Sequence, residues 1–67
     1  MIDVFVNGEP AELPEGATVA TVIAGLDLPS RGFAVALDRE VVPRGQWERA
    51  VLGDGSRLEV VRAVQGG

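Results

Sequence analysis

The 67-residue sequence predicts an α+β domain in which one helix packs across one mixed five-stranded sheet, in the order β-β-α-β-β-β. Three observations predict this class. Apolar residues recur with a period of two near the start, the spacing becomes helical after residue 16, and further strand-like runs follow between turn residues. A helix placed after an opening hairpin, with later strands returning, is typical of a helix covering one face of a sheet.

The opening stretch predicts a hairpin. Ile2, Val4 and Val6 alternate with more polar positions, which indicates a strand with one buried face. Asn7-Gly8 then supplies the two positive φ angles of a type I′ turn. Pro10 cannot donate to a ladder and Pro14 closes the segment, so the returning strand is expected to be short and at an edge.

The next stretch predicts an amphipathic helix of two to three turns. Its apolar residues fall at i, i+3, i+4 and i+7, namely Val19, Val22, Ile23 and Leu26. Thr18 is the expected N-cap, and Gly25 followed by Pro29 marks the far end. So short a helix is not stable alone in water, so the sheet must cover its apolar stripe.

The second half predicts three strands. The third runs from about Phe33 to Leu37, a turn at residues 38–39 follows, and a brief fourth strand passes through Val41 and Val42 before Pro43. Residues 44–52 are open to two readings, a helical turn or an irregular crossing. Asp54-Gly55 forms a turn, and a last strand follows over residues 57–64 with Leu58 and Val60 facing one way.

Composition narrows the classes of function. The chain has no cysteine and no histidine, so it lacks the usual general base, zinc ligands and thiol nucleophile, and we expect neither an enzyme nor a metal or cofactor site. The net charge is −4 and the six arginines are scattered, which argues against nucleic acid as a partner. No apolar run approaches a membrane span and no signal segment is evident, so the expected location is the cytoplasm, away from membranes.

Three aromatic or apolar positions bear on contact with partners, and two of them are candidates for it. Trp47 is interpreted as a lid on the core rather than as a contact residue. Phe5 lies on the strand face opposite Val4, and Val61 falls on the same uncovered face of the last strand. These two side chains are either ordinary surface scatter or the centre of a docking patch.

The chain closes on Val64, Gln65, Gly66 and Gly67. The simplest interpretation is a flexible remnant without a task. The alternative is chemical, because a terminal carboxylate is an anion at neutral pH and can attack the α-phosphate of a bound ATP. Glycine at both final positions would let the segment enter a narrow channel, and in extended form the four residues reach about 13 Å.

The strand order, the "VVPRGQW" segment before a "DGS" turn and the closing "VVRAVQGG" resemble the sulfur carriers of thiamine thiazole synthesis, in the ubiquitin-like β-grasp family. The resemblance covers the whole chain, which implies one carrier domain over residues 1–67 with a flexible tail over residues 64–67. It also implies a cycle. An E1-like enzyme adenylates Gly67 with ATP, a sulfur donor such as a cysteine desulfurase converts the adenylate to a thiocarboxylate, and thiazole synthase receives the sulfur.

In this cycle the chain is a carrier and co-substrate of enzymes, with Val64, Gln65 and Gly66 needed for activation and Phe5 and Val61 contacting partners. Two alternatives stay open. Carriers for molybdopterin or cysteine synthesis share the fold and the diglycine, and a non-covalent ubiquitin-like binding module would leave the diglycine idle.

Overall fold

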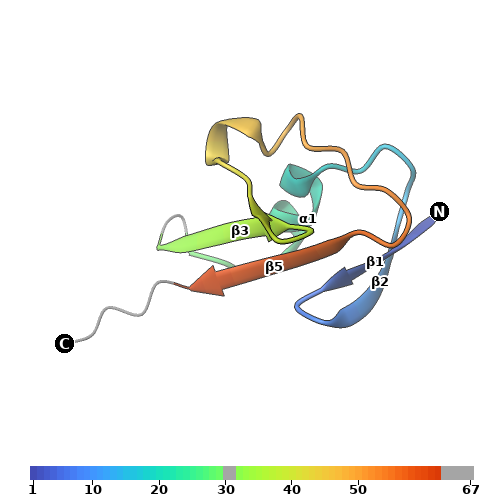
Figure 1. Cartoon of the computed structure of the whole chain (residues 1–67), viewed down its shortest axis with the longest axis horizontal. Coiled ribbons are helices and arrows are strands. Elements are labelled where there is room, and N and C mark those ends of the chain that lie inside the picture. The colour runs from blue at the N-terminus through green and yellow to red at the C-terminus, as the bar shows by residue number, and fades with distance from the viewer. Residues whose placement is uncertain (30–31, 63–67) are drawn as a thin grey trace.

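The computed structural model describes residues 1–29 and 32–62. The strands are β1 (Ile2–Val6), β2 (Glu9–Leu13), β3 (Phe33–Leu37), β4 (Glu40–Val41) and β5 (Arg57–Arg62), and helix α1 spans Val19–Gly25. A single 3₁₀ turn covers Arg44–Gln46. The five strands form one sheet in the order β2-β1-β5-β3-β4. As Figure 1 shows, the last strand lies in the middle of this sheet, beside the first.

The sheet is mixed, as predicted. β1 and β5 run parallel with Val6 opposite Leu58, and the other neighbouring strands are antiparallel. The α+β class and the β-grasp order are therefore confirmed. A parallel pair cannot be joined by a tight turn, so the chain between β1 and β5 must cross over, and α1 lies on that crossover.

The opening hairpin follows from its turn residues. Asn7 has φ 52° and Gly8 has φ 82°, the two positive angles that a type I′ turn requires. β2 is an edge strand, as expected, but it is not short, because it pairs with β1 over all five residues. Pro10 is tolerated because its missing N–H faces the open edge, where no ladder partner exists.

Helix α1 begins at the predicted cap. Thr18 accepts a hydrogen bond from the Thr21 amide at 3.3 Å, and the Thr21 hydroxyl accepts one from the Thr18 amide at 3.1 Å. The first two helical amides find partners elsewhere in the chain: Val19 donates to the Ala50 carbonyl and Ala20 to the Trp47 carbonyl. Two of the first-turn donors are thus satisfied by a distant segment, which fixes α1 against it.

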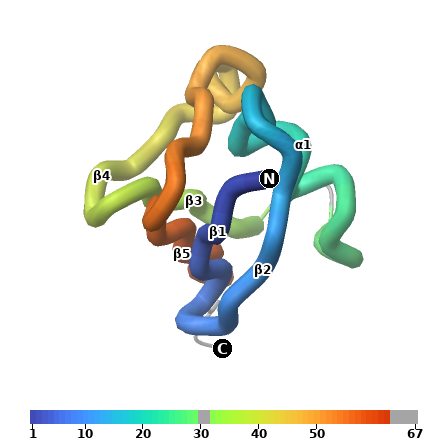
Figure 2. The backbone as a smooth tube through the Cα atoms, turned by 90° about the vertical axis from the view of Figure 1, so that its right-hand side faces the viewer, coloured from blue at the N-terminus to red at the C-terminus, as the bar shows by residue number. Residues whose placement is uncertain are grey.

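That distant segment is the stretch between β4 and β5, which arches over the start of α1 (Figure 2). The sequence left it open between a helical turn and an irregular crossing, and it contains both: the 3₁₀ turn is followed by irregular chain. β4 ends one residue earlier than predicted, at Val41, because Pro43 has no N–H with which to continue the pairing beyond Val42. The Val42 amide donates to the Val35 carbonyl at 2.8 Å and is the last contact of this kind between the two strands in the described part of the chain.

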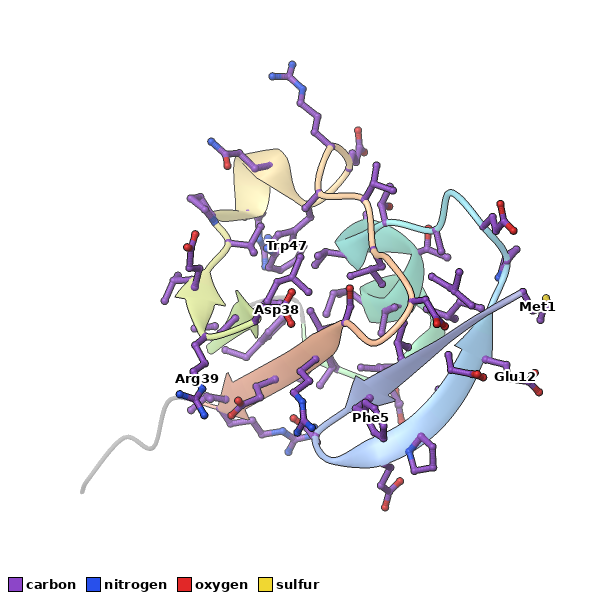
Figure 3. All side chains as sticks on the ribbon, turned by 45° about the vertical axis from the view of Figure 1, so that its right-hand side comes forward. Met1, Phe5, Glu12, Asp38, Arg39 and Trp47 are labelled. Atoms are coloured by element: carbon purple, nitrogen blue, oxygen red, sulfur yellow. The ribbon has the colours of Figure 1, made fainter. Side chains whose placement is uncertain are left out.

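The core lies between α1 and one face of the sheet. Its buried members come from three strands, the helix and the crossing segment: Val4, Val19, Val22, Val35, Leu52 and Leu58. Trp47 closes this core at one side, as predicted. Its ring stacks on Phe33 with centroids 5.5 Å apart, and its Nε1 donates to the Val42 carbonyl at 2.8 Å. Figure 3 places the Trp47 side chain between the crossing segment and the sheet.

Candidate functional site

The described part of the chain ends in β5, the strand that leads to the predicted carrier residues. β5 is bonded on both sides: the Phe5 amide donates to the Ser56 carbonyl and the Asn7 amide to the Leu58 carbonyl, each at 2.9 Å. On its other side five residues of β3 pair with it, from Leu37 opposite Leu58 to Phe33 opposite Arg62. Because β5 is hydrogen-bonded on both sides, the residues that come after it in the sequence are attached to a strand held firmly in the sheet.

Two side chains hold β5 where its neighbours turn away. β1 pairs with β5 only as far as Val6, after which the hairpin turns back. The Asn7 side chain then takes over, because its Oδ1 accepts from the Val60 amide at 2.8 Å. At the strand's start, Asp38 Oδ1 accepts from the Arg57 amide at 3.0 Å. Sequence reasoning assigned Asn7 to a turn and missed this second role, which depends on a partner 53 residues away.

The four predicted carrier residues, Val64, Gln65, Gly66 and Gly67, lie outside the described residues. Their role therefore stays a prediction.

The predicted facing of Phe5 and Val61 is confirmed, since neither belongs to the core. Val61 is 57% exposed on the sheet face that α1 does not cover, which we call the open face. Phe5 is half-buried on the same face, and the Arg57 guanidinium lies 5.2 Å from its ring centroid. Part of the Phe5 ring is thus covered by an arginine, whereas Val61 is directly accessible.

The structure does not bring Phe5 and Val61 together. Phe5 is paired with Arg57, and Val61 lies four residues further along β5, which is about 13 Å along a strand. Glu59 lies between them on the same face. The two residues therefore cannot be the joint centre of one apolar patch.

Val61 has other apolar neighbours that the sequence did not single out. It pairs with Ala34, and Ala36 on the same face pairs with Val41, which is 72% exposed. We call these four residues the open-face patch. Because Val35 on β3 is buried, strand alternation alone would have placed Ala34 and Ala36 on the open face. The position of Val41 beside Ala36 could be known only from the β3–β4 register.

Within residues 1–29 and 32–62, no three acidic side chains come together in a way that could hold a metal ion. No helix in that part of the chain is long and apolar enough to cross a membrane. Three features of the described residues are candidates for function: the strand β5 that leads to the predicted carrier residues, the open-face patch, and the Phe5 ring beside Arg57.

Comparisons of the sequence and of the structure with known proteins find relatives that share the name ThiS. The family model described as "ThiS family" matches residues 4–67. The chain is 27% identical over 66 residues to the sulfur carrier protein ThiS of Escherichia coli (strain K12), covering 98% of this chain and 100% of that protein. It is 38% identical over 64 residues to the sulfur carrier protein ThiS of Thermus thermophilus, covering 96% and 98%.

A second kind of relative is longer. The thiazole synthase of Paramagnetospirillum magneticum is 32% identical over 62 residues, which is 92% of this chain but 19% of that protein. Among solved structures, the crystal structure of a thiamine biosynthesis protein (ThiS) from Geobacter metallireducens superposes with a TM-score of 0.82. The sequences are 25% identical, and the match covers 98% of this chain and 100% of the other.

Proposed function

This chain belongs to the ThiS family, and we propose on that basis that it is a sulfur carrier of thiamine biosynthesis that bears its cargo on the carboxyl group of Gly67. The observation that carries the proposal is the extent of the family match, which runs through Gly66 and Gly67. Two relatives matched over nearly their whole length are named sulfur carrier proteins, which supports the same function.

The chemistry takes place at one carbon atom. A carboxylate oxygen of Gly67 attacks the α-phosphorus of ATP in the site of an E1-like enzyme, and pyrophosphate leaves. Hydrosulfide then attacks the carbonyl carbon and AMP leaves. Where a cysteine desulfurase is the donor, its persulfide sulfur attacks instead, AMP leaves, and a thiol reductant cleaves the S–S bond of the acyl disulfide that forms. The product is a thiocarboxylate, which an acceptor enzyme uses as its sulfur source.

The carrier's own residues position this carbon. Gly66 and Gly67 have no side chain to collide with the walls of an active-site channel, and in extended form Val64 and Gln65 would span the distance from the sheet to that channel. The hydrogen bonds on both sides of β5 support this arrangement, because they keep the strand in place when a partner binds the residues beyond it.

We propose thiazole synthase as the acceptor. Two thiazole synthases contain a segment similar to this chain over about a fifth of their length. A carrier-like segment and a synthase joined in one polypeptide meet at a high effective concentration, which supports the synthase as the acceptor that such a segment serves. Val61, with the open-face patch, and Phe5 are the residues proposed to contact these partners.

Intact mass spectrometry tests the proposal. The purified chain is incubated with ATP, hydrosulfide and an activating enzyme that is active on its own carrier. We expect the mass to rise by the difference between a sulfur and an oxygen atom, and we expect a variant lacking Gly67 to stay unchanged.

The remaining alternatives predict other outcomes. A wild-type chain that is never thiolated would favour the non-covalent binding module. A chain that is thiolated but transfers no sulfur to thiazole synthase, while serving a molybdopterin or cysteine pathway, would assign it to the related carriers.

A further inference from the structure

A groove separates the edge strand β2 from helix α1, on the side of the molecule away from β3 and β4. It has a volume of about 500 Å³, and residues of both elements line it, among them Ala11, Leu13, Val22, Gly25 and Leu26. Figure 2 shows β2 and α1 running along the same side of the fold. Ala11 and Gly25 leave the groove open, and a Cβ added to Gly25 would meet no heavy atom within 4 Å. The lining is mainly aliphatic, so it suits an aliphatic side chain.

The backbone of β2 beside this groove has unpaired groups. Asp3 donates its amide to Asp54 Oδ1 at 2.8 Å and Phe5 donates to the Ser56 carbonyl, both on the side of β1 away from β2. Their partners in register, Glu12 and Pro10, are therefore the non-hydrogen-bonded positions of the hairpin. The Glu12 N–H and the carbonyls of Glu12 and Pro10 point to the open edge, where an added strand would meet them.

The charged side chains of β2 have one sign, with Glu9 lining the groove and Glu12 on the opposite face of the strand. Residues 1–30 contain five acidic side chains and no lysine or arginine, whereas the rest of the chain carries all six arginines. Glu9 and Glu12 are exposed on β2, and Figure 3 shows the Glu12 side chain directed away from the domain. An occupant that carries positive charge beside its aliphatic residues would be attracted, and one that carries negative charge would be repelled.

We propose that this groove is a docking site for an extended segment of a partner protein, in which aliphatic residues are flanked by lysine or arginine. The segment adds a strand to the edge of β2 and places an aliphatic side chain between β2 and α1. Its cations lie beside Glu9 at the groove and, across the edge of the sheet, beside Glu12. A second copy of this chain fits poorly, because pairing two β2 edges would bring Glu12 against Glu12 and Pro10 offers no donor.

The proposal is independent of the carrier chemistry at Gly67. β1 separates β2 from β5, so a partner seated in the groove leaves the open face uncovered. A protein bound in this way can hold the carrier while another enzyme works on its far end.

Titration of the ¹⁵N-labelled full chain with capped peptides tests the site. The probe is acetyl-Lys-Val-Ile-Val-Lys-amide, and the matched peptide is acetyl-Glu-Val-Ile-Val-Glu-amide. We expect the lysine peptide alone to shift amide resonances within residues 9–13 and 19–26, with an affinity that falls as salt increases. Equal binding of both peptides, shifts confined to the open face, or no shift at millimolar peptide would overturn the proposal.

Paired variants locate the binding. Gly25→Leu fills the groove on a helical position without positive φ, and it should weaken the lysine peptide at least about tenfold, the contribution of one buried aliphatic side chain. Gly45→Leu, at an equally open glycine outside the groove, should change nothing. Glu12→Lys should weaken binding about two- to fivefold, and Glu48→Lys should not. Identical affinities for Gly25→Leu and the wild type would contradict the assignment, and unchanged spectra elsewhere confirm that each variant folds.

Discussion

The hydrogen bond from the Val60 amide to Asn7 Oδ1 can be tested by replacing Asn7 with glycine. Glycine adopts the positive φ of 52° without steric cost, so the type I′ turn is kept and the side-chain acceptor is lost. The bond lies in an exposed position, where water can take the place of the amide. The loss should therefore be near the net value of one hydrogen bond, about 1 kcal/mol.

The matched control is Asn7→Asp. Aspartate also tolerates the left-handed conformation, and its carboxylate oxygen can accept from the Val60 amide in the same place. We expect this variant to keep most of the stability that Asn7→Gly loses. The difference between the two variants isolates the acceptor from the turn.

Thermal and urea unfolding followed by circular dichroism measure the loss, and hydrogen exchange of the Val60 amide locates it. A loss of about 1 kcal/mol lowers the Tm of a domain of this size by about 4–8 °C. Val60 should exchange faster in Asn7→Gly than in Asn7→Asp, because only the first leaves its N–H open to water. Equal exchange rates in the two variants, or equal destabilisation, would refute the view that Asn7 holds the end of β5.

Three further predictions follow from burial and backbone geometry. Leu58→Ala, at a side chain only 1% exposed, should lower the free energy of unfolding in urea by about 2–5 kcal/mol. Val41→Ala on the open face should change it by no more than about 0.5 kcal/mol. Similar losses for the two variants would show that the core assignment is wrong. Arg39→Gly should stabilise the fold by about 0.5–1 kcal/mol, because Arg39 has a positive φ of 72° that glycine adopts without steric cost. A lower Tm of the variant would show that the Arg39 side chain stabilises the fold by more than the backbone strain destabilises it. Val61→Asp should weaken binding to an activating enzyme more than Phe5→Asp, because Arg57 already covers part of the Phe5 ring. Circular dichroism should be unchanged in both variants. If calorimetric titration shows the larger loss of affinity for Phe5→Asp, the contact belongs to Phe5 instead.

The local elements were predictable because short-range rules decide them. The Asn7-Gly8 turn follows from two residues that accept positive φ, and the start of α1 follows from the Thr18 cap and the helical spacing of Val19 and Val22. The facing of Phe5 follows from the alternation of a strand. Each of these features depends on neighbours within about one turn of helix or one hairpin.

The candidate site was predicted only in part. The resemblance of the sequence pointed to the family that the comparisons show, and strand alternation placed Phe5 and Val61 outside the core. The separation of Phe5 and Val61 by about 13 Å along β5, the neighbours of Val61 and the groove beside β2 did not follow from alternation. All three depend on which strands are adjacent and in which register.

The sequence by itself therefore determined which segments are strands, turns and helix outside residues 44–52, apart from the length of β2 and the end of β4, and which face of each is apolar. The tertiary structure alone decided that the first and last strands lie parallel at the centre, that residues 47–50 accept the first amides of α1, and that Asn7 holds Val60. The physical reason is that backbone angles and periodicity are local properties of a chain. The pairing of distant segments is instead fixed by burying all apolar faces in one core while leaving few polar groups without partners.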